Sequence, residues 1–218
     1  MARRPLLTAA ALAASAALLL TACGGGSDDG KKPDKIEGAE EGGKKSPSPS
    51  KSPESDPIAA KRPQLKDQEG FSTVFDGWSS DDPKQNAVLL DGKYQALAVN
   101  SAIFKQDPEA PEVKFYYAGP ALVDAQEWVA GFKKNGHTLT GTLRYYDPHV
   151  KLTSDGVATL RYCTDESKAF SKDLKTDKVD RTEPSPKSYV LYVAALEKNS
   201  EGVWQTTSLV SQRGKCQP

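Results

Sequence analysis

The chain has 218 residues, of which 29 are Lys or Arg and 29 are Asp or Glu, so its formal net charge is zero. No basic run stands out in the part expected to fold. Nucleic acid is therefore not an expected partner, because binding phosphate needs clustered Lys and Arg. Beyond its leader and polar segments the chain keeps about 150 residues, the size of one ordinary domain.

The N-terminus has the pattern of a secretory leader. Arg3 and Arg4 precede an apolar stretch that ends in Leu20-Thr21-Ala22-Cys23. A basic start, an apolar segment and small residues before a cut are typical of a signal peptide, whereas a transmembrane helix would be longer. A cysteine directly after Leu-Thr-Ala resembles the bacterial lipobox, whose cysteine is lipidated and becomes the first mature residue. We expect a signal peptide at residues 1–22, acyl chains such as palmitate on Cys23, and a lipid anchor at the extracytoplasmic face of the cell membrane.

Residues 23–66 have a composition that does not favour folding. They are rich in Gly, Ser, Pro and charged residues and hold almost no large apolar side chain. Such a segment buries too little apolar surface to offset the entropy of ordering. The Ser-Pro run at residues 46–53 favours an extended polyproline II conformation. We expect a disordered linker that separates the membrane from a single globular domain at residues 67–218.

The first half of that domain carries helical signals. Apolar residues recur at helical spacing over residues 71–78, which predicts a turn or two of helix. Asp82-Pro83 begins a helix of about twenty residues, and Asp107-Pro108 ends it. A second helix is expected over residues 120–135, since Gly136 follows as a stop signal.

The second half changes to the alternating period of strands. Residues 139–146 alternate apolar and polar side chains, Asp147-Pro148 interrupts them, and a further strand spans residues 157–164. A charged excursion covers residues 165–186, and two more strands form a hairpin around the turn at residues 199–202. Helices first and an antiparallel meander afterwards predict an α+β fold.

Two cysteines, Cys163 and Cys216, remain in the domain. An even number of cysteines in an exported protein favours a disulfide. If the strands lie in chain order, one strand separates the two strand ends and puts them beyond disulfide reach. The tail after residue 211 is long enough to fold back and close the gap. A metal site is a poorer reading, because these cysteines and His137 and His149 lack ligand spacing; we expect no metal and no cofactor.

This order of elements resembles the nuclear-transport-factor-two-like, or ketosteroid-isomerase-like, cone, which is also described as cystatin-like. The resemblance implies N-terminal helices packed in a curved antiparallel sheet, with a pocket at the open end. Three segments, Arg144–Pro148, Tyr162–Ala169 and Gly202–Thr207, are also similar to small actinobacterial secreted lipoproteins, a group without an established activity. Relatives of this fold often dimerise through the open face of the sheet, so the resemblance also admits a homodimer.

Enzymes with such a cone use an Asp base and Tyr donors in an apolar pocket. The candidate pocket residues here are the aromatic side chains of helix and sheet together with one acid: Tyr116, Trp128, Tyr145, Tyr162, Asp165, Tyr192 and Trp204. Each aromatic also has a structural reading, because half-buried Tyr and Trp pack well in strands and cores. Asp165 either faces a ligand or caps a short helix. None of these residues lies in a motif of the enzymes, so we assign no catalytic residue.

We expect a non-enzymatic module that binds an apolar small molecule or an interaction partner at the cell envelope and is held to the membrane by its lipid. Two alternatives stay open. One is an isomerase or cyclase with Asp165 as the proton acceptor and a tyrosine as the donor, which requires Asp165 to face a cavity. The other is a protein–protein adaptor, which requires a filled cone and an apolar surface patch.

Overall fold

The computed structural model describes residues 58–154 and 156–218 of the chain. The predicted signal peptide, Cys23 and most of the predicted linker lie outside these residues. The elements are η1 (Ala59–Lys61), β1 (Phe71–Phe75), α1 (Pro83–Lys105), α2 (Pro111–Tyr116), α3 (Gly119–Asn135), β2 (His137–Ser154), β3 (Val157–Asp173), β4 (Val179–Asp180), η2 (Pro186–Ser188), β5 (Tyr189–Lys198) and β6 (Trp204–Arg213). Within the described ranges, no helix is long and apolar enough to cross a membrane.

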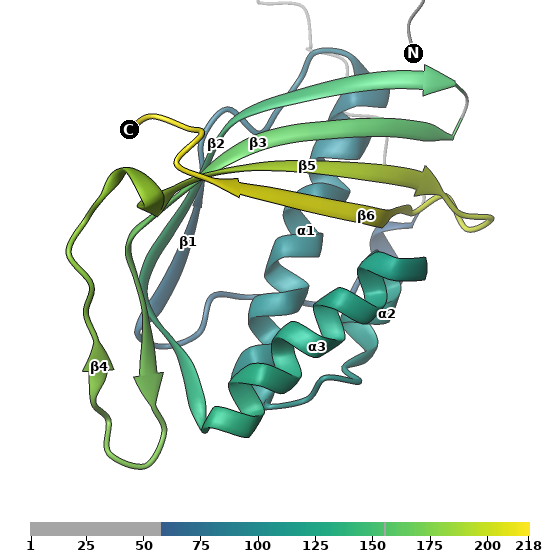
Figure 1. Cartoon of the computed structure of the whole chain (residues 1–218). Helices are drawn as coiled ribbons and strands as arrows, with labels where there is room; N and C mark the ends of the chain where they lie inside the picture. The colour runs from purple at the N-terminus through teal and green to yellow at the C-terminus, as the bar shows by residue number, and fades with distance from the viewer. Residues whose placement is uncertain (1–57, 155) are drawn as a thin grey trace, which may run out of the picture. The chain divides into compact units, whose positions relative to one another are not determined.

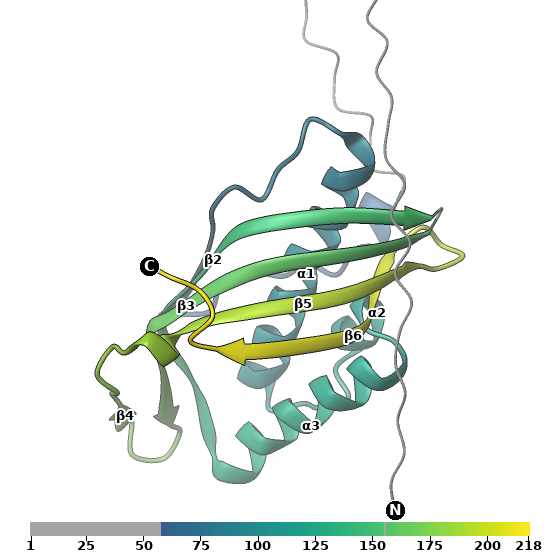
Figure 2. The same ribbon diagram turned by 45° about the horizontal axis from the view of Figure 1, so that its top comes forward.

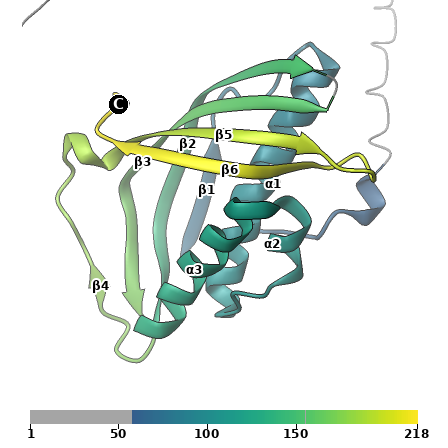
Figure 3. The same ribbon diagram turned by 45° about the vertical axis from the view of Figure 1, so that its right-hand side comes forward.

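The strands form one curved sheet in the order β1-β2-β3-β5-β6, with the short β4 paired to the far end of β3. The three helices lie against its concave side (Figure 1). The four long strands run side by side over the helices (Figure 2), and a side view shows the sheet curving around α1 (Figure 3). The predicted α+β fold, with helices packed in a curved sheet, is confirmed. The sheet is mixed rather than antiparallel, because β1 runs parallel to β2.

The helical turn predicted over residues 71–78 is wrong. Phe71–Phe75 is a strand that pairs in register with Gly141–Tyr145 of β2. Side chains at every second position of a strand share a face, so Phe71 and Phe75 both point toward the helices. Phe71 is buried and Phe75 stacks on Tyr145 at 4.8 Å. Aromatic packing against a distant strand outweighs a local spacing that also fits a helix.

Both long helices have the ends that their sequences predict. The Asp82 carboxylate caps α1 by accepting hydrogen bonds from the backbone N–H groups of Lys84 (2.8 Å) and Gln85 (3.4 Å). Gly136 ends α3 in the left-handed conformation, at φ 65°. These signals act within one helical turn, so the surrounding fold does not alter them.

The two central strands are longer than predicted. β2 continues past Asp147, which takes φ 52° beside a shift in register, and β3 continues to Asp173 through much of the predicted charged excursion. β2 bends at Gly141, where φ is 94° and an added Cβ would lie 2.0 Å from the Lys168 carbonyl oxygen. Only glycine adopts this conformation at so close an approach. The bend lets one pair of strands form both the wall of the cone and its open end.

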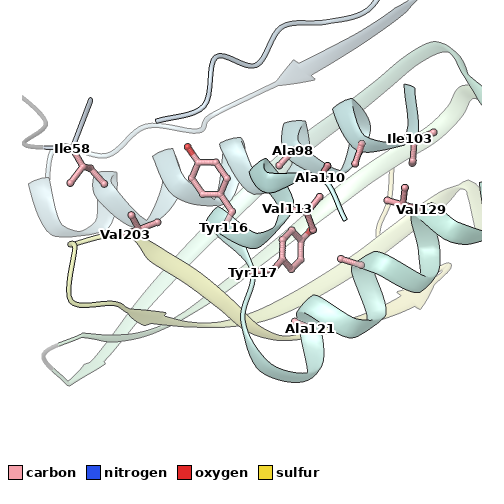
Figure 4. Close-up of a cluster of buried hydrophobic side chains, with 12 residues drawn as sticks. Ile58, Ala98, Ile103, Ala110, Val113, Tyr116, Tyr117, Ala121, Val129 and Val203 are labelled. Carbon is pink, nitrogen blue, oxygen red and sulfur yellow. The ribbon is translucent and has the colours of Figure 1, made fainter. Parts of the chain in front are cut away.

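The core consists of two clusters. One lies among the helices and includes Val113 and Tyr116 of α2 and Val129 of α3 (Figure 4). The other packs α1 against the sheet and is richer in aromatic side chains. Ile58 belongs to the first cluster and is 6% exposed. The packing of this cluster therefore includes Ile58, the first residue that the structure describes.

A disulfide joins Cys163 of β3 to Cys216 of the C-terminal tail, with their Cα atoms 6.0 Å apart. β5 lies between β3 and β6, as expected from the chain order. Beyond Gly214 the tail folds back over the sheet (Figure 2), and Tyr146 donates a hydrogen bond from its hydroxyl to the Gln217 carbonyl oxygen. The bridge therefore fastens the tail across the end of β5.

Candidate functional site

A cavity of about 610 Å³ lies between α1, α3 and the concave face of the sheet. Its walls are largely apolar and aromatic. Contributing side chains include Phe71 of β1, Ile103 of α1, Phe132 of α3 and Leu143 of β2. Sites for small molecules have this size and this mixture of apolar walls with a few polar groups.

Four of the predicted pocket residues line this cavity. They are Trp128 of α3, Tyr145 of β2, Tyr162 of β3 and Tyr192 of β5. The three tyrosines are neighbours across adjacent strands: the rings of Tyr145 and Tyr162 lie 5.8 Å apart, and those of Tyr162 and Tyr192 stack at 5.2 Å. Side chains on a strand alternate between its two faces, and the register of the three strands places these three tyrosines on the same face of the sheet.

Tyr116 and Trp204 do not line the cavity. Tyr116 is fully buried among the helices, and its hydroxyl accepts a hydrogen bond from Arg62 at 3.4 Å. Burial raises the pKa of Tyr116 to about 12, although the neighbouring Arg62 opposes the rise. Trp204 begins β6 and donates its backbone N–H to Asp91 at 2.9 Å. Both residues therefore belong to the packed core rather than to the cavity wall.

Asp165 is also absent from the cavity wall. It lies within β3, where its backbone is in register with Arg144 of β2 on one side and with Tyr189 of β5 on the other. Its carboxylate accepts a hydrogen bond from the backbone N–H of Ser167 at 2.9 Å. The predicted helix cap at Asp165 is wrong because the strand continues, and the strand period places Glu166 on the cavity side instead.

Tyr145 and Tyr162 carry the most informative polar atoms of the wall. Their side chains are only 7% and 4% exposed. Within residues 58–154 and 156–218, neither hydroxyl has a hydrogen-bond partner. Burial raises the pKa of both phenols well above the usual value, and neighbouring tyrosines add to the rise. Both hydroxyls therefore stay protonated and can donate a hydrogen bond into the cavity.

A second polar group lies where the cavity meets solvent. The Arg213 guanidinium donates to Glu166 at 2.8 Å, and the Tyr192 hydroxyl donates to the same carboxylate at 3.4 Å. Burial raises the pKa of Tyr192, the Glu166 charge raises it further, and Arg213 opposes both. From the sequence, Glu166 was weighed only as part of the polar cluster at residues 165–168, and neither Glu166 nor Arg213 was among the candidate pocket residues. The signal for Glu166 was its spacing of four from Tyr162, which puts both on one strand face.

The opposite side of the opening is formed by α3. Asp124 and Trp128 lie one helical turn apart and both line the cavity. Trp128 is 58% exposed, and its ring meets Phe132 edge-on at 5.4 Å. Side chains four residues apart on a helix are neighbours on one face. The opening is thus flanked by an aromatic ring and a carboxylate on α3, and by the Glu166–Arg213 pair on the sheet.

The arrangement suits an apolar or aromatic ligand that carries a hydrogen-bonding group. Among the described residues, no three His, Cys, Asp or Glu side chains gather as a metal site would require. The polar groups of the wall are tyrosine phenols, two carboxylates, one guanidinium, the amides of Gln95 and Asn100, and the hydroxyls of Ser171 and Ser211. Such groups can orient a molecule by donating hydrogen bonds to it or accepting them from it.

No family model matches the chain, and no curated protein matches its sequence. Among solved structures, the chain is similar to a ketosteroid isomerase-like protein from Erwinia carotovora atroseptica. The identity is 17%, the TM-score is 0.41, and the match covers 58% of this chain and 93% of that one. It is also similar to the intermembrane space region of the chloroplast protein ARC6, at 13% identity and a TM-score of 0.39, over 62% of this chain and 97% of that one. Likenesses at these values assign no residue a role.

Proposed function

We propose that the protein is a binding module, anchored by lipid at the extracytoplasmic face of the cell membrane, that holds an apolar small molecule in the cavity between α1, α3 and the sheet. The observation that carries the proposal is the pair of hydroxyls of Tyr145 and Tyr162, which have no hydrogen-bond partner among the described residues although both residues are nearly buried in the cavity wall. Neither oxygen is among the fully buried atoms that lack a partner, so both keep some accessible surface. A ligand that accepts from these phenols would gain about 0.5–1.5 kcal/mol from each hydrogen bond.

The cavity also favours this proposal over an adaptor without a pocket. An adaptor was expected to have a filled cone, whereas a volume of about 610 Å³ separates the helices from the sheet. The walls hold both apolar rings and donors, the mixture with which proteins bind and orient small organic molecules.

A second candidate function is proton transfer within the cavity. The version that used Asp165 loses its support, because Asp165 is outside the wall. Glu166 favours a revised version, since it lines the cavity within 3.4 Å of the Tyr192 hydroxyl. Glu166 as proton acceptor and a protonated tyrosine as donor are the roles that isomerases need. Turnover of an envelope metabolite by the protein, lost in Glu166→Gln, would favour this candidate over binding alone.

The test of the binding proposal uses the full chain purified from its own host. Native mass spectrometry is expected to show a small molecule that copurifies with the protein. The double variant Tyr145→Phe/Tyr162→Phe should no longer copurify with the small molecule, because it removes both hydrogen-bond donors and keeps both rings. Tyr146→Phe is the matched control, since the Tyr146 hydroxyl bonds the C-terminal tail instead. A ligand-free protein, or a ligand that both variants retain equally, would contradict the proposal.

The anchor has its own test. Mass spectrometry of the intact envelope form should show acyl chains on Cys23 and no residues before it. A form that begins at Met1, or an unmodified Cys23, would contradict the anchored part of the proposal and leave the cavity part standing.

A further inference from the structure

The charged groups at the cavity opening differ in how they are paired. Three charged side chains line the cavity: Asp124, Glu166 and Arg213. Glu166 and Arg213 form an ion pair at 2.8 Å, and Arg213 also donates to the Lys187 carbonyl oxygen at 3.2 Å. Within the described ranges, Asp124 has neither a hydrogen bond nor an ion pair. The negative charge that is left over at the opening is therefore that of Asp124.

An aromatic ring lies next to that charge. Trp128 follows Asp124 by one turn of α3, and more than half of its surface is exposed although it lines the cavity. Phe170, another ring of the wall, already has the Arg181 guanidinium 5.2 Å from its centre. Trp128 is the ring at the opening that none of the described cations covers. Indole is also the side chain on which cations bind best.

We propose that the ligand of this cavity carries a protonated amine or a quaternary ammonium group, which binds at the opening between the Asp124 carboxylate and the Trp128 ring while its apolar body fills the cavity. The inference rests on the proposed binding function and names the chemical class of its ligand. The inner phenols of Tyr145 and Tyr162 hold the other end of the molecule through a group that accepts hydrogen bonds.

An anionic head group fits the opening less well. Its only cation in the wall would be Arg213, whose guanidinium is already shared between Glu166 and a carbonyl oxygen. A ligand carboxylate would have to displace Glu166 and would also meet the charge of Asp124. Like charges in one opening weaken binding.

Three matched probes test the ammonium preference separately from the proposed binding function. 2-Naphthylmethylamine is a cation at pH 7, 2-naphthalenemethanol is its neutral counterpart, and 2-naphthoate is the anion. Titration calorimetry on the full chain measures the dissociation constant of each. We expect the amine to bind about five- to twentyfold more tightly than the alcohol, from one half-exposed ion pair and one cation–π contact, and the acid to bind most weakly.

Two variants and a control test which residues cause the preference for the amine over the alcohol. Asp124→Asn should reduce the ratio of amine to alcohol affinity to about twofold, and Trp128→Leu should reduce it by about two- to fivefold. Glu127→Gln is the control: it removes a carboxylate from the same exposed helix, outside the cavity wall, and should leave the ratio unchanged.

The outcomes distinguish the two ideas. Equal binding of amine and alcohol, or a preference that Asp124→Asn leaves intact, overturns the ammonium inference while the binding function stands. Binding of the acid in preference to the amine has the same meaning. If none of the three probes binds, the proposed function fails and the inference falls with it.

Discussion

An ion pair between an arginine and an acid lies at each end of β6, one buried and the other partly exposed to solvent. At its first residue, Asp91 accepts the backbone N–H of Trp204 and pairs with Arg62, and the two side chains are 8% (Arg62) and 1% (Asp91) exposed. At its last residue, Arg213 pairs with Glu166, and these side chains are 56% and 23% exposed. The first pair closes the cone, and the second lies where it opens.

The comparison shows how burial separates a structural pair from one available to a ligand. Arg62 also donates to the Tyr116 hydroxyl and lies over the Tyr94 ring, 5.6 Å from its centre. Asp91, the Tyr116 hydroxyl and the Tyr94 ring thus all contact one buried guanidinium within the fold. Arg213 and Glu166 keep contact with water and border a cavity with unpartnered hydroxyls. We therefore expect changes at the closed end to alter stability and changes at the open end to alter binding.

The largest effect is expected from Asp91→Asn. The substitution removes the charge that balances a buried guanidinium, which typically costs about 3–5 kcal/mol. Urea unfolding of the full chain should show this loss in the free energy of unfolding. Asp76→Asn is the matched control, because Asp76 pairs with Arg144 through side chains that are 49% and 38% exposed. It should cost less than about 1 kcal/mol. Equal losses of stability in the two variants would contradict the conclusion that the buried ion pair matters more for folding than the exposed one.

Gly141→Ala should have the next largest effect, at the open end of the sheet. The added Cβ would collide with the Lys168 carbonyl oxygen at a backbone conformation that alanine disfavours, so we expect a loss of about 2–4 kcal/mol. Gly131→Ala in α3 is the control. Its Cβ would meet no atom within 4 Å, and alanine should stabilise a helix interior by about 0.5–1 kcal/mol. Unfolding midpoints that move in the same direction would contradict the role given to the bend.

Local signals in the sequence predicted the parts of this fold that depend on neighbouring residues. Asp82 and Gly136 mark helix ends through contacts within one turn, and the alternation around Tyr145 and Tyr162 places both on one face. The strand at Phe71–Phe75 was missed because its partner lies about seventy residues away in β2. Asp165 was chosen over Glu166 for a similar reason: the continued pairing of β3 with β2 past residue 165 decides which of the two faces the cavity. A charged run read alone does not reveal its pairing.

The Arg62–Asp91 pair could not be read from the sequence either. Arg62 lies in the segment expected to be linker, and Asp91 lies on the predicted helix, where an acid is ordinarily solvated. What brings them together is the packing of Ile58 and its neighbours onto the helices. Buried ion pairs between distant segments have no periodic signature, whereas apolar faces do.

Alkaline pH offers a smaller effect that tests the closed end. Burial raises the pKa of Tyr116 from 10.0 to about 12, so the folded state keeps the phenol proton more strongly than the unfolded state does. Its contribution to stability is complete below pH 10 and is lost as the pH rises from 10 toward 12. Urea unfolding at pH 9, 10 and 11 should show a shallower decline in Tyr116→Phe than in the parent protein. Parallel declines would show that Tyr116 does not titrate differently in the folded state.

The smallest change in stability is expected from Arg213→Ala, which nevertheless sharpens the comparison most. More than half of the arginine side chain is exposed, so its loss should cost less than about 1 kcal/mol in the free energy of unfolding. Glu166 then loses its countercharge, and the cavity lining, which also includes Asp124, gains one net negative charge. The ratio of amine to alcohol affinity in the naphthyl series should rise by about two- to fivefold, and added salt should reduce the rise because exposed charges are screened. A large loss of stability with an unchanged ratio would instead place Arg213 in the same structural class as Arg62, and the contrast between the two ends of β6 would disappear.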